Sequence, residues 1–545
     1  MTEKALQLPD GWDNSRDIVL IVGEHSAASL APFVSHGVKR ILALFPEPLQ
    51  IEDVPEGVTA IQTEAELRNW VMKLAKPAKH IRVGKTASCT VDDAVIKHFM
   101  EAISTAAQKG RDFLLTLYEL APFWAHNGVR NNHFIASRPM IGDVGDAFKG
   151  VPMIVVGAGP SLAKNIDVLK KAQGKAIIVA VNRTLRSLQN AGIHPDFTIA
   201  LEPRDVRCQF EGIALDQIPG VLLATSVDRN LYELEDAFTL SYYNNAVLDG
   251  WMLDAVDQRH EASSMGTVSH SAFTLGVAWG CDPIMLVGHD LSFPDGKYYH
   301  KDGADGDTEV VIDPVTGEST LSGFSEDVTN TLLGDAPKAF HAVEVPGYYG
   351  GMVPTSPSFS NFREWFEQLA DQYGRDHRLV NCTEGGAFIR GMEHLPLADV
   401  MADLPDTKPN VRGVLAHTEA STAVQERSQR MRMRHVVMTR DLDRVAQLSK
   451  KCLRLIDKSM TRSQFLDQLS QAEALLKSAS AKIEALNLAT QEAIKTAVSS
   501  GAEIKTVRDS LRFSKKLYTI IHEQSRLLHR EGQEVLDTWP ETPHN

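Results

Sequence analysis

The sequence predicts an α/β protein, in which a central Rossmann-like domain follows a smaller α/β domain and precedes an all-α helical bundle. Between residues 151 and 287, short β-branched runs alternate with helical stretches, which is typical of a parallel sheet covered by helices on both faces. Two similar runs, Ile18 to Val22 and Ile41 to Phe45, lie near the start of the chain. Beyond Pro409 no proline occurs until Pro540, and apolar residues recur at helical spacing.

The chain of 545 residues is long enough for about three domains, each with its own hydrophobic core. We place an N-terminal α/β domain at residues 1–129, the Rossmann-like domain at 130–408 and the helical domain at 409–545. Within the helical domain, Leu469, Ala472 and Leu476 begin an apolar stripe. We expect this stripe to pack against a neighbouring helix of the same bundle.

Composition limits the partners of the protein. The net charge of −14 argues against nucleic acid or an anionic membrane as the main partner. No apolar run approaches the roughly 18 residues of a membrane span, and the first residues lack a signal-peptide pattern. Five scattered cysteines fit reduced thiols. We therefore expect a soluble, cytoplasmic protein without a membrane span.

A glycine turn follows the first buried strand of the central domain, in the segment from Val151 to Leu162. Its two glycines allow the backbone to approach a ligand, and its proline suits the first turn of a helix. Amides at such a helix start attract an anion. The third glycine of the dinucleotide pattern is absent, which favours a mononucleotide or nucleotide-sugar over NAD. The predicted phosphate-binding residues are Gly157, Gly159, Pro160 and Ser161. A turn that merely joins strand to helix is the alternative.

Polar residues end the next strands of the predicted sheet. Asn182, Glu202 and Ser226 each follow an apolar run. Ligands of parallel α/β sheets bind beyond the carboxyl ends of the strands, where all three residues would lie. Polar residues also end strands simply to begin turns, so a structural role remains open for each.

A second informative block runs from Gly266 to His300. It predicts a helix that opens on Thr267 and Ser269, and then a buried strand from Ile284 to Val287. We expect His289 and Asp290, which follow that strand, to face the same crevice as the glycine turn.

These features resemble the motility accessory factor (Maf) proteins, which are proposed flagellin glycosyltransferases and contain a DUF115 domain. The resemblance covers roughly residues 130 to 400. The central region is similar, more distantly, to bacterial sialyltransferases, which have a GT-A-variant, Rossmann-like fold and use CMP-activated sugars. Three stretches carry the resemblance: Gly157-Ala-Gly-Pro-Ser-Leu162, Gly288-His-Asp-Leu-Ser-Phe293 and Asn381-Cys-Thr-Glu-Gly-Gly-Ala-Phe-Ile-Arg-Gly391.

The resemblance implies transfer of a nonulosonic acid, pseudaminic or legionaminic acid, from a CMP donor to serine or threonine hydroxyls of flagellin. Flagellin and the CMP-nonulosonic acid would be the partners, and the reaction would support flagellum assembly. No cofactor is required beyond the donor, while a role for a divalent metal stays open. The same domain family includes hydroxymethylpterin diphosphokinases. An ATP- and Mg²⁺-dependent pyrophosphoryl transferase and a non-catalytic flagellin-binding chaperone are therefore the alternatives.

The resemblance also suggests roles for single residues on the donor side. Backbone amides of the glycine turn would hold the phosphate of CMP without a metal. In the sialyltransferases a tyrosine donates to that phosphate, and Tyr298 or Tyr299 lies at a comparable place in this chain; we select Tyr299. Asn182 matches an asparagine near the nucleotide, while Thr267 and Ser269 fall near the cytidine-binding turn.

The catalytic base departs from the family pattern. The sialyltransferases place a histidine before their last catalytic helix, but residues 349–361 of this chain contain none. A hydroxyl acceptor must lose its proton as it attacks, which leaves Asp290, Glu202 and His300 as candidates. We favour Asp290, with a structural acid that caps the next turn as the alternative.

Two charged segments have open interpretations. His300, Asp302, Asp305, Asp307 and Glu309 crowd one loop, which is either a solvated acidic loop or a divalent-ion site. The second segment is a basic helix that either presents a solvated face or contacts an acidic partner. Its arginines are Arg427, Arg430, Arg432, Arg434, Arg440 and Arg444.

Overall fold

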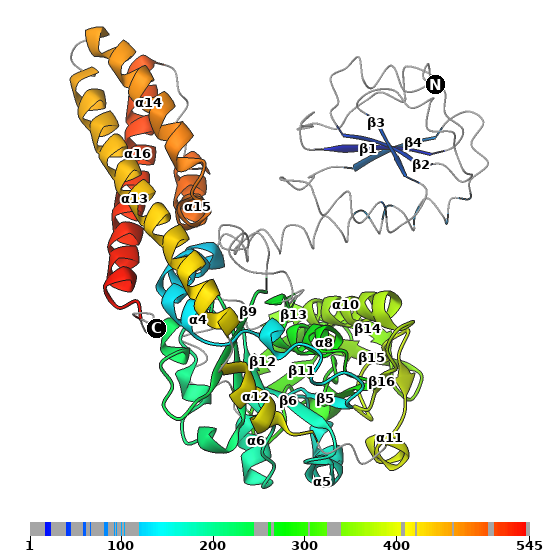
Figure 1. The fold of residues 1–545 in the computed structure, drawn as a ribbon. Coiled ribbons are helices and arrows are strands. Elements are labelled where there is room, and N and C mark those ends of the chain that lie inside the picture. Colours follow the sequence, from blue (N-terminus) through cyan, green and yellow to red (C-terminus); the bar gives the residue numbers. More distant parts are fainter. Residues whose placement is uncertain are drawn as a thin grey trace. The chain divides into compact units, whose positions relative to one another are not determined.

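The computed structural model divides into two compact units, Met1–Leu120 and Ala121–Asn545, shown in Figure 1. The second unit contains both the central sheet and the C-terminal helices, so the predicted boundaries at 129 and 408 stay predictions. The described residues are 17–22, 40–44, 58–61, 81–85, 119–244, 260–262, 266–303, 306–323, 339–404, 409–419, 422–459, 463–499 and 506–540, with six single residues between 66 and 103.

The first unit contains a four-stranded parallel sheet in the order β3-β2-β1-β4. Its two predicted strands are confirmed, because β1 and β2 fall on the apolar runs near the start of the chain. The strands are β1 (Ile18–Val22), β2 (Ile41–Leu44), β3 (Val58–Ile61) and β4 (Ile81–Lys85).

The second unit is built on an eight-stranded sheet in the order β17-β16-β10-β5-β6-β7-β8-β9, with all neighbours parallel. The chain runs outward from β5 to β9 and then returns to place β10 on the other side of β5. The strands are β5 (Met153–Val156), β6 (Ile177–Val181), β7 (Phe197–Ala200), β8 (Gly220–Ala224), β9 (Thr239–Tyr242), β10 (Ile284–Val287), β16 (Leu379–Asn381) and β17 (Glu393–His394).

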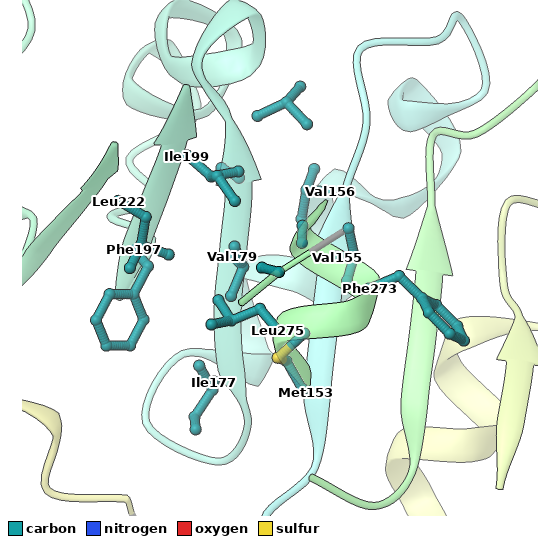
Figure 2. Close-up of a cluster of buried hydrophobic side chains, with 14 of the residues drawn as sticks. Met153, Val155, Val156, Ile177, Val179, Phe197, Ile199, Leu222, Phe273 and Leu275 are labelled. Carbon is teal, nitrogen blue, oxygen red and sulfur yellow. The ribbon is translucent and has the colours of Figure 1, made fainter. Parts of the chain in front are cut away.

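Every residue of the central strands β5, β6, β7, β8 and β10 is buried, which explains their continuous apolar sequences. Helix α8 approaches so closely that a Cβ on Gly276 would lie 2.5 Å from the Met153 side chain. Figure 2 shows Leu275 of the same helix beside Ile177 and Val179 of β6. The helices of this domain are α4 (Asn132–Ser137), α5 (Leu162–Ala172), α6 (Leu185–Asn190), α8 (Val268–Ala278), α10 (Pro357–Tyr373) and α11 (Leu397–Asp403).

Two small antiparallel sheets are inserted between β10 and β16. One has the order β11-β12-β13 and the other is the hairpin β14-β15. Their strands are β11 (Glu309–Ile312), β12 (Glu318–Ser322), β13 (Ala339–His341), β14 (Val343–Pro346) and β15 (Met352–Thr355). The hairpin leads directly into α10, whose first turn is capped by Ser356.

The remainder of the chain is helical, as predicted. The long helices α13 and α16 pack along each other, α14 packs on α13, and α15 packs on α16; Figure 1 shows all four side by side. In the described part of the chain, no helix combines the length and apolar composition needed to cross a bilayer. The helices are α12 (Val411–Glu419), α13 (Thr422–Ser459), α14 (Leu466–Ser480), α15 (Glu484–Ser499) and α16 (Val507–Asp537).

Buried polar contacts attach α13 and α16 to the sheet domain. The Nδ1 of His435 on α13 accepts a hydrogen bond from Asn132 Nδ2 at 2.7 Å. Its Nε2 donates to the Gly532 carbonyl at 2.9 Å. Arg427 is only 3% exposed and pairs with Asp143 at 2.9 Å. The structure therefore corrects the sequence interpretation for this arginine, which anchors the helix and is not part of a solvated face.

We expect Arg427→Ala to lower the free energy of unfolding by about 3–5 kcal/mol, because it leaves the buried Asp143 carboxylate without its cation. The matched control is Arg440→Ala on the same helix, where the side chain is 72% exposed and the change should stay within about 0.5 kcal/mol. Urea unfolding followed by circular dichroism measures both. Equal losses for the two variants would contradict the anchoring role.

Candidate functional site

The carboxyl ends of β5 and β10 form the point where the strand order reverses. The two strands are paired in register from Ile284 with Met153 to Val287 with Val156. The chain leaves β5 toward α5 and leaves β10 toward the inserted strands β11 to β15, so the loops after these neighbouring strands lead to opposite parts of the domain order. In open α/β sheets this reversal point is where ligands bind.

The glycine turn after β5 lies against the loop after β10. The N–H of Gly157 donates to the carbonyl of Val287, and that of Gly159 donates to the carbonyl of Gly288, both at 2.8 Å. The N–H of Ser161 donates to Asp290 Oδ2 at 3.1 Å. These donors are thus engaged within the protein. Phosphate binding by the turn would require the bonds to exchange, and it stays a prediction.

Asp290 occupies the anion position at the start of α5. The Ser161 hydroxyl donates to its Oδ1, in addition to the backbone bond to Oδ2. The side chain is 2% exposed, and burial raises the pKa of its carboxyl to about 6 against the opposing effect of the Ser161 bonds. A Cβ on Gly159 would overlap this carboxylate. The contacts favour a structural role for Asp290, but at the start of α5, whereas the alternative taken from sequence placed it at the turn that follows Asp290.

A second glycine pair, Gly385 and Gly386, closes this contact from the loop after β16. Gly386 has a φ of 73°, which favours glycine, and a Cβ there would overlap the Asp290 backbone. The N–H of Ala387 donates to the Asp290 carbonyl at 2.7 Å. Sequence reasoning assigned this pair no role, although its position directly after a buried strand was a usable signal.

His289 lies beside the same glycine turn as Asp290, as expected, because a Cβ on Gly157 would lie 3.0 Å from the His289 ring. Its ring meets Phe366 of α10 edge-on, with 5.7 Å between centroids. Burial lowers the pKa of its imidazole to about 3, so the ring is neutral near pH 7.

The predicted residues of the outer strands are mainly engaged in structure. Ser226 is 1% exposed, and its carbonyl accepts from Asn127 Nδ2 at 3.0 Å. Asn182 is also buried and donates to Gln209 Oε1 at 2.7 Å. Glu202 is half-buried, and its Oε1 accepts from the Arg204 N–H at 3.3 Å. Glu202 therefore keeps more contact with solvent than the other two.

The start of α8 lies at the same edge of the sheet, because this helix runs from there to the beginning of β10. Thr267 is its N-cap, and the hydroxyl accepts from the His270 N–H at 3.2 Å. Ser269 is half-buried in the first turn. The prediction that the helix opens on these two residues is confirmed, while their contact with a nucleotide stays a prediction.

Tyr299 and His300 lie beside the glycine turn, since the N–H of His300 donates to the Ala158 carbonyl at 2.8 Å. The guanidinium of Arg183, which follows β6, stands 4.6 Å from the centre of the Tyr299 ring. Tyr298 instead packs its ring against Phe293 and other aromatic side chains. The structure thus brings Tyr299, His300 and Arg183 together, and sequence reasoning had given the arginine no role.

His300 is held in one orientation. Its Nδ1 lies 3.1 Å from Ser187 Oγ and accepts from the Asp302 N–H at 3.3 Å. A backbone N–H can only donate, so the neutral ring carries its proton on Nε2. Burial lowers the pKa of this imidazole. At neutral pH His300 is therefore suited to donate a hydrogen bond from Nε2.

No metal cluster is evident in the described part of this region. The described residues contain no group of three or more His, Cys, Asp or Glu side chains that could hold a metal ion. Asp305 of the predicted acidic loop lies outside the described residues.

A groove of about 870 Å³ lies between α15 and α16, in the helical region. It is lined by small or apolar residues such as Ala493, Ala497 and Ile520, with Arg512 and Lys516 among its basic residues. These helices are separate in sequence and structure from the strand ends described above. The groove is therefore not part of the candidate catalytic region.

Comparisons with known proteins agree with this architecture. Residues 126–296 match a family described as 6-hydroxymethylpterin diphosphokinase MptE-like. A search of curated proteins found no significant match. The structure is similar to that of a Maf glycosyltransferase from Magnetospirillum magneticum AMB-1, with 14% sequence identity, a TM-score of 0.51, and coverage of 96% of this chain and 80% of that chain. The predicted resemblance is confirmed at the level of the fold, an α/β protein with a helical C-terminal region.

The raised pKa of Asp290 predicts a specific pH dependence of stability. An aspartate has a pKa near 3.9 when unfolded, so between about pH 4 and pH 6 the native state holds a proton that the unfolded chain releases. The contribution of this carboxyl to the free energy of unfolding therefore falls as pH rises through that window.

Asp290→Asn lacks this titration, and its stability relative to the wild type should increase by about 2 kcal/mol between pH 4 and pH 7. Urea unfolding at several pH values measures the difference in the free energy of unfolding between Asp290→Asn and the wild type. The other buried groups titrate in both proteins, so their contributions cancel in this difference. A difference that does not change with pH would contradict the buried, proton-holding state of Asp290.

Proposed function

We propose that this protein is a glycosyltransferase that moves a nonulosonic acid from a CMP-activated donor to serine or threonine hydroxyls of flagellin. The observation that carries the proposal is the similarity in fold to a Maf glycosyltransferase over 96% of this chain. A coverage of 96% includes the N-terminal unit and the C-terminal helices as well as the sheet domain. A match to a common nucleotide-binding fold alone would cover only the sheet domain.

The donor is proposed to bind at the carboxyl edge of the sheet, beside the reversal point between β5 and β10. Arg183 offers a fixed positive charge there, and Tyr299 packs beneath its guanidinium. His300 offers an N–H donor from the same loop. Cations and preorganised donors of this kind stabilise the negative charge that develops on a departing phosphate. The first turn of α8, with Thr267 and Ser269, provides further backbone amides at this edge.

We propose Glu202 as the base that removes the proton of the acceptor hydroxyl. Of the three candidates, it is the carboxylate that retains solvent exposure. Asp290 and His300 are 2% and 5% exposed, whereas Glu202 is half-buried. A base must reach the proton it removes, so access favours Glu202.

A pyrophosphoryl transferase that uses ATP and Mg²⁺ is the second candidate, because residues 126–296 match the MptE-like family. Calorimetry with CMP, with ATP and Mg²⁺, and with purified flagellin separates the alternatives. Binding of CMP together with a mass increase on flagellin, coexpressed with a nonulosonate pathway, would support the glycosyltransferase. Binding of ATP and Mg²⁺ without CMP would reject it in favour of the kinase, and binding of flagellin alone would favour a chaperone.

The hydroxyl of Tyr299 should act mainly on the departing phosphate. Tyr299→Phe keeps the ring beneath Arg183, so we expect transfer to slow by about 10²-fold, while the Kd for CMP changes by less than about threefold. Tyr298→Phe serves as the comparison, because that ring packs among other aromatic residues. A larger loss of transfer rate in Tyr298→Phe would show that the Tyr298 hydroxyl, and not that of Tyr299, donates to the departing phosphate.

The assignment of the base is tested by two isosteric changes. We expect Glu202→Gln to reduce transfer by about 10²–10⁴-fold and Asp290→Asn to retain most of it, with both variants folded by circular dichroism. The rate is followed as the mass increase on flagellin. Loss of transfer in Asp290→Asn with full activity in Glu202→Gln would instead identify Asp290 as the base.

A further inference from the structure

One face of α13 is exposed along much of its length. The exposed positions recur at spacings of three, four and seven residues, which places them on one side of a helix. At 1.5 Å per residue the row extends over roughly 32 Å. We call this face the α13 basic stripe, and it consists of Met433, Val437, Arg440, Arg444, Lys451 and Arg454.

The opposite face of α13 supplies the packing of the helix. Met438, Leu442, Val445 and Cys452 are buried there, and α13 packs against α14 and α16. The stripe is thus the side of the helix that intramolecular packing does not use.

Four of the six side chains in the stripe are basic and none is acidic, in a chain with a net charge of −14. Arg440 lies 3.4 Å from Asp441, but these side chains are 72% and 37% exposed. An exposed pair of this kind contributes little. The stripe therefore presents a local excess of positive charge on an otherwise acidic protein.

One end of the stripe carries exposed apolar side chains in place of basic ones. Met433 is 64% exposed, Val437 is 44% exposed, and the adjoining Val436 is 42% exposed. An exposed apolar cluster beside charged residues is typical of a protein-binding surface. Nucleic acid phosphates would use the arginines but not these aliphatic groups, and the acidity of the whole chain opposes binding to nucleic acid and to anionic lipid.

We propose that the α13 basic stripe docks an acidic helical segment of a partner protein. Apolar residues of the partner would pack on Met433 and Val437, while flanking Glu or Asp side chains would face Arg440, Arg444 and Lys451. Helices recognise each other in this way through an apolar seam with complementary charges beside it. The inference does not depend on the reaction proposed above, although it suits an enzyme whose acceptor is a protein.

The probe for this surface is a fluorescent synthetic helix of roughly 21 residues, long enough to match the stripe. It carries leucines at helical spacing with Glu on both flanks, and a counterpart carries Gln in place of Glu. Anisotropy with the full chain should show tighter binding of the Glu peptide and weakening as salt rises from about 50 to about 300 mM.

Two charge-reversed variants of the full chain identify the binding face. Arg440→Glu/Arg444→Glu should weaken binding of the Glu peptide by about tenfold or more. The matched control, Arg432→Glu/Lys450→Glu, makes the same change at exposed positions on the flank of the same helix and should alter the Kd by less than about twofold. Met433→Gln/Val437→Gln should also weaken binding without a change of charge. Circular dichroism confirms that each variant is folded.

Several results would overturn the proposal. Equal affinity for the Glu and Gln peptides, or equal losses in the stripe and control variants, would show that the stripe is a solvated face. Tighter binding of single-stranded DNA or of phosphatidylserine vesicles than of the Glu peptide would assign the charge to a different class of partner. Self-association that the stripe reversal abolishes would assign it to a second copy of this chain. Binding is measured without donor, so failure here leaves the proposed transfer reaction unaffected.

Discussion

The contact between Asp290 and Ser161 is the constraint on which the centre of this protein depends. It joins the loop after β10 to the first turn of α5, and the backbone bonds of Gly157 and Gly159 run beside it. Three glycines make room for it, Gly159 and Gly385 beside the two side chains and Gly386 beside the Asp290 backbone. A negative charge at the start of α5 is favourable because of the helix dipole. The strand reversal is thus closed locally by contacts within the protein, which is why the donor site is proposed beside it, at Arg183 and Tyr299.

The order of elements was predictable because each signal was local. Buried parallel strands read as continuous apolar runs, and the glycine turn, the opening of α8 and the helical C-terminal region all fall where their sequence patterns indicate. The break between α14 and α15 was not foreseen, because residues 481–483 contain neither Gly nor Pro. The helical spacing of apolar residues continues across the break, so the sequence pattern does not mark it. The break depends on packing between helices.

The site was less predictable, since side-chain partners come from distant strands. The pattern from Gly157 to Ser161 indicates that something anionic approaches the helix start, but it does not tell a ligand phosphate from a carboxylate of the same chain. Asp290 comes more than a hundred residues later, and only the return of β10 to the side of β5 brings the two together. For the same reason Arg427 looked like one member of a basic run, whereas its partner Asp143 makes it a buried anchor.

The continuity of α13 has a mechanical consequence. This single helix of 38 residues runs without interruption from Thr422 to Ser459 and is about 57 Å long. The Arg427–Asp143 pair attaches one end of the helix to the sheet domain, and the basic stripe begins six residues further along, at Met433, and continues to Arg454. A partner segment bound along α13 would therefore be tethered to the sheet domain, at a distance that depends on its position along the helix.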